Sequence, residues 1–164
     1  MKKIIAILLI CFLLITIANY LSSFKEKTFL ESSNYKYDET SKVLMQCSGI
    51  KESKVIYNID ELLKYLDKFS YKRLKLNKQN VVERKPKESC FIIFMNSNDK
   101  SSFLNFFGGE YEGTQVVMIN DFLYKVDGEI KFEFLKEFYI SSEGKIVDWL
   151  WLNYSSFLGT IGIQ

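Results

Sequence analysis

The residues of this chain that could perform acid-base chemistry are three pairs of closely spaced carboxylates. The pairs are Asp60 with Glu61, Glu110 with Glu112, and Glu133 with Glu137. A glycosidase needs two carboxyl groups at a defined separation across a cleft. The second pair, however, stands beside glycines in an expected loop, and the third pair alternates with lysines. We therefore interpret all six as solvated charges and predict no catalytic residue.

The chain contains no histidine, which limits the nucleophiles that it could use. Ser-His-Asp and Cys-His catalysis and zinc hydrolysis of the HExxH type are excluded. A serine activated by a lysine is still possible in principle. The Ser-x-x-Lys spacing occurs at Ser22, Ser33, Ser48, Ser97 and Ser142. None of these serines is expected to open a helix, so a Ser-Lys hydrolase is an alternative and not the favoured function.

Two of the three cysteines, Cys47 and Cys90, fall in expected strands. A disulfide between them is permitted outside the cytoplasm and would stabilise the fold by about 3 to 4 kcal/mol. Two buried free thiols are the alternative. Two cysteines without a histidine make a poor zinc site, and the glycine spacing fits no phosphate-binding loop. We expect no metal and no cofactor.

The first 24 residues decide where such chemistry would take place. Eighteen uncharged residues, Ile4 to Leu21, follow Lys2 and Lys3, and twelve of them are Ile, Leu or Phe. As a helix, this run is about 27 Å long, near the lower limit for crossing a bilayer. We predict a single-pass anchor in the cell membrane through residues 4–21, with the N-terminus inside and the domain outside. The alternative is a signal peptide cleaved near Ala18, which would leave the protein secreted.

Changes in composition divide the remaining chain into three segments. Residues 25–42 are polar and charged, which predicts a stalk. Residues 43–140 form the expected extracytoplasmic domain, and residues 141–164 form an aromatic tail that could be a last strand. In that tail, an interface is predicted at Trp149, Trp151 and Tyr154. Without Lys2 and Lys3, 20 of the 22 basic residues remain against 20 acidic ones, which argues against nucleic acid as a partner.

The predicted fold class is α+β, with an N-terminal membrane helix followed by one mainly antiparallel sheet that is packed by one or two helices. Strands are expected at 43–47, 54–57, 90–95, 103–107, 115–119 and 122–126. The last two are separated by Asn120 and Asp121, which favour a tight hairpin. Apolar residues at helical spacing predict a helix over 59–69, with Asn58 as its cap. Residues 127–141 fit a helix or a strand, and we favour the helix.

Residues 71–88 contain seven basic and two acidic side chains. A solvated strand or loop accounts for this composition, and contact with anionic head groups or a cell-wall polymer is the functional alternative. The residues of this possible anionic-surface contact are Lys72, Arg73, Lys75, Lys78, Arg84, Lys85 and Lys87.

The order of these elements resembles that of small uncharacterised envelope proteins of Gram-positive bacteria, such as the YhfM-like lipoprotein domains. The resemblance covers residues 43–140 and rests on the helix IDELLKYLDKF and on INDFLYKVDG leading into FEFLKEF. The chain departs from a lipoprotein because Cys11 follows Ile10 and no lipobox is present. The resemblance implies an envelope location and offers no catalytic residue to carry over.

Taken together, these features predict a membrane-anchored extracytoplasmic protein that is not an enzyme. We expect a binding or regulatory module, immunity-like in kind, whose partner is an envelope protein or polymer. The first alternative is an envelope hydrolase that uses carboxylates or a Ser-Lys dyad. The second is a structural membrane accessory that acts through its single helix.

Overall fold

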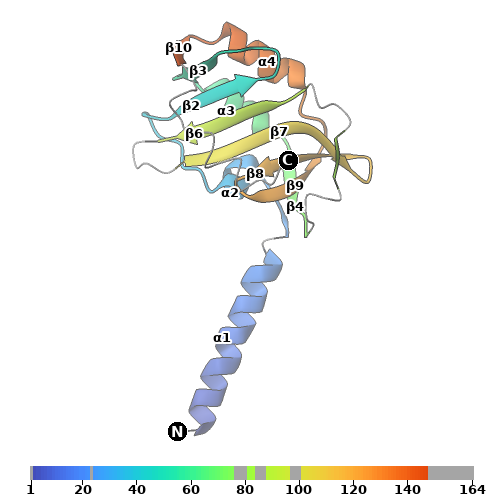
Figure 1. Cartoon of the computed structure of the whole chain (residues 1–164). Coiled ribbons are helices and arrows are strands. Elements are labelled where there is room, and N and C mark those ends of the chain that lie inside the picture. The colour runs from blue at the N-terminus through green and yellow to red at the C-terminus, as the bar shows by residue number, and fades with distance from the viewer. Residues whose placement is uncertain (1, 23, 76–80, 84–87, 97–100, 148–164) are drawn as a thin grey trace.

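The computed structural model describes residues 2–22, 24–75, 81–83, 88–96 and 101–147 (Figure 1). Within these ranges there are four helices: α1 (Lys2–Ser22), α2 (Phe29–Ser33), α3 (Asp60–Leu66) and α4 (Phe132–Ser141). The strands are β1 (Glu26–Lys27), β2 (Lys42–Cys47), β3 (Ser53–Ile56), β4 (Ser70–Arg73), β5 (Val82–Glu83), β6 (Cys90–Met95), β7 (Ser101–Tyr111), β8 (Thr114–Ile119), β9 (Phe122–Asp127) and β10 (Gly144–Val147).

The strands form one antiparallel sheet. Nine of them follow a single hydrogen-bonded path in the order β1-β4-β9-β8-β7-β6-β2-β3-β10, and β5 pairs with β7 off this path. The centre of the sheet is β7, whose eleven residues pair with both β6 and β8. Its register with β8 shifts between Asn105 and Gly109, which marks a β-bulge.

The predicted fold class is wrong and needs correction. We expected an N-terminal membrane helix and then a sheet packed by one or two helices. The chain instead forms mainly one antiparallel sheet, with nine strands on its main path and β5 beside β7, and has few helices, which makes it a small α+β-like fold. Among the residues that the structure describes, no helix is both long and apolar enough to cross a membrane.

The segment from 25 to 42 is also not the stalk that its polar composition predicts. It contributes β1 to the edge of the sheet, and Thr28 and Glu31 form a capping box that starts α2. Phe29 of α2 is fully buried, with its ring centroid 4.9 Å from that of Phe94. Tyr35 of the same segment is also buried, with its ring centroid 5.4 Å from that of Phe94. Two buried aromatic rings therefore anchor a segment whose other residues are largely polar.

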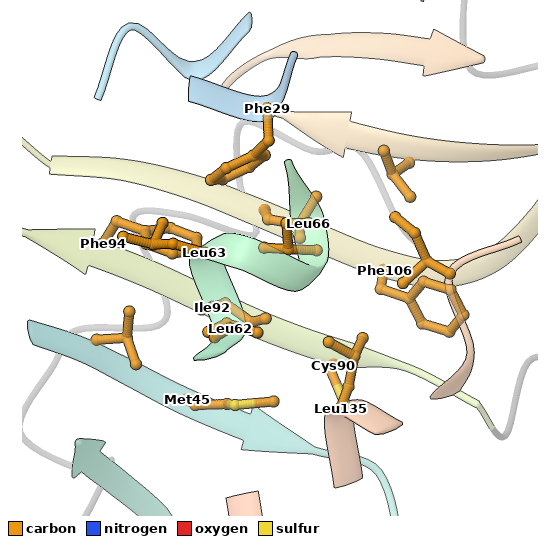
Figure 2. Packing of buried hydrophobic residues seen from close by; sticks show 14 of the residues in the cluster. Phe29, Met45, Leu62, Leu63, Leu66, Cys90, Ile92, Phe94, Phe106 and Leu135 are labelled. Atoms are coloured by element: carbon orange, nitrogen blue, oxygen red, sulfur yellow. The ribbon is translucent and has the colours of Figure 1, made fainter. Parts of the chain in front are cut away.

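The main core lies between one face of the sheet and the helices α2, α3 and α4. Figure 2 shows Leu62, Leu63 and Leu66 of α3 lying over β6, the strand that carries Ile92 and Phe94. The period-two alternation of β6 sends Cys90, Ile92 and Phe94 to this face. A smaller cluster, built on Val116, Met118 and Leu123, lies apart from the main core.

Most expected strands are present, but two details of the helices differ from prediction. The helix over 127–141 is α4, which begins only at Phe132. The predicted cap of the first helix is wrong, because Ile59 occupies the N-cap of α3 and makes no side-chain cap bond. The exposed Asp60 instead accepts a hydrogen bond from the hydroxyl of Tyr37.

Candidate functional site

A pocket of about 280 Å³ lies where the β7–β8 hairpin meets the loop between β9 and α4. Glycines and glutamates make up much of its lining, and its apolar part is formed by Phe106, Ile130 and Phe132. The residues that line it are Glu88, Phe106, Gly108, Gly109, Glu110, Gly113, Thr114, Gln115, Gly128, Glu129, Ile130, Phe132 and Glu133.

The loop between β9 and α4, which forms one wall of the pocket, is held in place by hydrogen bonds to the side chains of Gln115 and Tyr65. The backbone N–H of Ile130 donates to Oε1 of Gln115 over 2.8 Å, and Nε2 of Gln115 donates back to the Ile130 carbonyl over 3.0 Å. The N–H of Lys131 donates to the hydroxyl oxygen of Tyr65 over 2.9 Å. Burial raises the pKa of Tyr65, so its hydroxyl stays neutral. These bonds fix the wall before any ligand arrives.

The hairpin wall depends on glycines. Gly108 has φ 61° and Gly113 has φ 72°, which are left-handed conformations that glycine adopts without strain. A Cβ on Gly109 would overlap the ring of Phe107. The backbone of β7 can therefore border the pocket directly, and a side chain at any of the three positions would disturb this wall.

Stacked aromatic rings support the pocket from below. The rings of Phe106 and Phe132 lie nearly parallel, with an interplanar angle of 13° and centroids 6.3 Å apart. Beside them, Tyr65 stacks on Phe134 of α4 with a centroid distance of 3.6 Å. The stacking joins α3, α4 and the sheet, so the start of α4 is rigidly positioned over β7.

The charged residues among the described lining of the pocket are all acidic. Four glutamates line it, Glu88, Glu110, Glu129 and Glu133, and none of its described lining residues is basic. Glu129 and Glu133 are exposed, whereas Glu88 and Glu110 are half-buried. Within the described ranges, no three acidic, histidine or cysteine side chains are arranged to hold a metal ion. The arrangement suits an organic cation better than a bare metal ion.

The pocket brings together carboxylates that are far apart in the sequence, and it contains only one member of each of two sequence pairs. Glu110 and Glu133 line it, but their sequence partners Glu112 and Glu137 do not. Glu112 instead forms a surface salt bridge of 3.7 Å with Lys125. The grouping of Glu110 with Glu133 depends on the return of the chain through β8 and β9, which spacing alone does not reveal.

Sequence reasoning missed two members of the site, Glu88 and Glu129. Glu88 stands next to Ser89 and Glu129 next to Gly128, and neither has a motif around it. The nearby glycines Gly108, Gly109 and Gly113 were seen in the sequence, but their spacing fits no phosphate-binding loop, so they predicted no site.

One of the Ser-x-x-Lys pairs reaches a second, more open hollow. Ser142 and Lys145 line a groove of about 790 Å³ between the start of α3 and the end of α4. No hydrogen bond joins their side chains in the described part of the chain. Ser33 and Ser48 are engaged in backbone hydrogen bonds instead, and Ser97 lies outside the described residues.

The structure contains a disulfide between Cys47 and Cys90, one of the two alternatives that the sequence left open. The two residues face each other across β2 and β6, with 4.0 Å between their Cα atoms. Cys11 is a free, exposed cysteine in α1.

Of the seven basic residues predicted to meet an anionic surface, three are described. Lys72 and Lys75 are exposed, and Arg73 is half-buried. The other four, at positions 78, 84, 85 and 87, lie outside the described residues. So do Trp149, Trp151 and Tyr154 of the predicted aromatic interface.

Comparisons with protein-family models, with curated proteins and with solved structures found no match to this chain.

Proposed function

We propose that this protein is a non-catalytic binding module of the cell envelope, which holds a basic side chain of a partner protein or peptide in the acid-lined pocket. The observation that carries this proposal is the combination of four glutamates, a stacked aromatic support and no basic residue among the described lining. A regulatory role, such as immunity, would follow if the captured partner is thereby inhibited.

The size of the pocket favours a side chain over a larger ligand. Sites for drug-sized molecules usually have about 300 to 1,000 Å³, and this pocket is just below that range at about 280 Å³. A long cationic side chain places its apolar stem against aromatic rings and its charge at the rim. Arginine fits best, because its planar group can bond a carboxylate through two N–H donors.

The location outside the cytoplasm is supported by the disulfide. Disulfides persist in oxidising compartments and are rare in the reducing cytosol. The bond between Cys47 and Cys90 joins the two neighbouring strands β2 and β6 within the core.

The proposal can be tested by titrating the protein with the tripeptide Gly-Arg-Gly and following backbone amide shifts by NMR. We expect the shifts to concentrate at Thr114, Gln115 and Glu129. Replacing Glu133→Gln should weaken the affinity by about two- to fivefold, as for the loss of one exposed ion pair.

The matched control is Glu137→Gln, an exposed glutamate one helical turn further along α4 that does not line the pocket. It makes the same change in net charge and should leave the affinity unchanged. Equal weakening by both variants would reduce the effect to general electrostatics and would contradict a specific site.

A further inference from the structure

The end of α1 meets the sheet edge at a cluster of basic and aromatic side chains, which we call the basic-aromatic junction. Its members come from three segments that are far apart in the sequence. They are Tyr20, Phe24, Arg73, Lys75 and Phe122.

Strand pairing explains why these residues meet. The strand β1 pairs antiparallel with β4 so that Glu26 faces Lys72, and continuing this register brings Phe24 beside the residues that follow β4. On the other side, β4 pairs with β9, and the N–H of Leu74 donates to the Leu123 carbonyl over 2.8 Å. The chain just before β1 and the start of β9 are thereby brought to the same end of β4.

Both basic side chains of the junction lie against aromatic rings. The guanidinium carbon of Arg73 is 3.3 Å from the ring centroid of Phe122 and 5.9 Å from that of Phe24. The ammonium nitrogen of Lys75 is 4.5 Å from the centroid of Phe24 and 5.4 Å from that of Tyr20. The Tyr20 and Phe24 rings are packed edge to face at 5.1 Å.

Neither basic group forms a salt bridge with a carboxylate of the described residues. In the part of the chain that the structure describes, the only salt bridge joins Lys125 to Glu112, so Arg73 and Lys75 form none. A guanidinium that lies on a ring face keeps the N–H donors at its edge free for an oxyanion. The junction therefore presents two positive charges whose positions are fixed by rings and whose donors are available.

We propose that the basic-aromatic junction is a binding surface for the anionic head groups of lipids. Aromatic rings of Tyr and Trp type favour the boundary between lipid and water, and basic residues beside them attract phosphate. The helix that leads into the junction exposes apolar side chains, and from Ile4 to Leu21 these are 45% to 71% exposed. A lipid surface is the partner that matches both the exposed apolar side chains of α1 and the positive charge of the basic-aromatic junction.

The experiment measures binding of the full chain to vesicles of phosphatidylcholine alone and to vesicles that also contain phosphatidylglycerol. The anionic lipid should raise the affinity, and the double substitution Arg73→Gln with Lys75→Gln should lower the affinity for the anionic vesicles by about 25-fold. The estimate follows from about fivefold for each basic residue at an anionic surface. A second double variant, Arg73→Lys with Lys75→Arg, keeps both positive charges and should keep most of the gain in affinity from the anionic lipid.

The matched control replaces Lys64→Gln and Lys68→Gln, two exposed lysines at α3 and its C-terminal end. It makes the same change in net charge and should keep the gain. An equal loss in the control, or no loss in the junction variant, would overturn the proposal. Saturable binding of inorganic phosphate that disappears in the junction variant, without any preference for phosphatidylglycerol, would also overturn it in favour of a free phosphate ligand.

Discussion

At the scale of single residues, Tyr71 shows how burial fixes a protonation state. The side chain is fully buried, and its hydroxyl donates to the Leu66 carbonyl over 2.9 Å. Burial raises the pKa of Tyr71 well above its ordinary value, and the charge of Asp67 acts in the same direction. The folded state therefore holds the phenol proton more tightly than the unfolded chain does.

This shift predicts how stability depends on alkaline pH. Below the unfolded pKa of about 10, both states carry the proton and the stabilisation is complete. As the pH rises further, the unfolded chain loses its proton first, so the free energy of unfolding falls. Tyr71→Phe should cost about 1 kcal/mol at neutral pH and make the alkaline decline shallower in urea titrations. An unchanged slope would show that Tyr71 does not titrate in the unfolding equilibrium.

Asn120 combines a left-handed backbone with side-chain bonds that few other residues could make. Its φ is 51°, its Oδ1 accepts from the N–H of Phe103 over 3.0 Å, and its Nδ2 donates to the Ser33 carbonyl over 3.2 Å. The side chain thereby joins the end of α2 to the β8–β9 hairpin.

We predict that Asn120→Gly lowers the free energy of unfolding by about 1 to 2 kcal/mol, because glycine keeps the backbone conformation and loses the bonds. The control is Asn34→Gly, since Asn34 also has a positive φ of 55° but is exposed. Chemical denaturation should find the control within about 0.5 kcal/mol of the unchanged protein. Similar effects of both substitutions would mean that the Asn120 side-chain bonds add little.

At the scale of elements, strands were easier to predict than short helices. The two apolar runs on either side of Asn120 and Asp121 located β8 and β9 nearly to the residue. In contrast, α2 has only five residues in a polar segment, too few for a periodic signal. Its existence depends on Phe29 entering a core that the distant strands β4 and β6 provide. No local pattern contains that information.

The pocket, too, could not be predicted from local sequence patterns. Glycines in the β7–β8 hairpin were visible in the sequence, as were Glu110 and Glu133. Their convergence requires the bulge in β7 and the path of the β9–α4 loop, which are tertiary features.

Gln115 is the side chain that connects these two elements, and its removal should loosen the pocket. We predict that Gln115→Leu speeds hydrogen exchange of the Ile130 amide, which loses its acceptor, and weakens binding of Gly-Arg-Gly. The Lys131 amide is an internal control because its acceptor, the Tyr65 oxygen, is retained. If the Ile130 amide stays protected, Gln115 is not what holds the loop.

At the scale of the whole molecule, the order of the strands could not be read from the sequence. The path places β4 beside both β1 and β9, and it sets β2 and β3 between β6 and β10. These pairings join segments up to about 90 residues apart, as when Gly144 faces Ile56. Burial patterns indicate which face of a strand is apolar, but they do not specify its neighbours.

The disulfide should contribute to the stability of this entire sheet. It links residues 43 positions apart, and a crosslink over such a loop stabilises by about 2 to 4 kcal/mol. We predict that Cys47→Ala with Cys90→Ala lowers the free energy of unfolding by that amount, measured by denaturation without reductant. The Cys11→Ala variant is the control and should unfold as the unchanged protein does. Equal stability with and without the crosslink would contradict this role.

The most direct test of the central claim is whether the acid-lined pocket distinguishes charge from shape. The measurement compares the affinities of Gly-Arg-Gly and of Gly-citrulline-Gly, in which the side chain has nearly the same shape but no charge. We predict binding of the arginine peptide at the amides of Thr114 and Glu129, weakened by salt, and little or no binding of the citrulline peptide. Equal affinities for the two peptides, or arginine-dependent shifts elsewhere on the protein, would contradict the account.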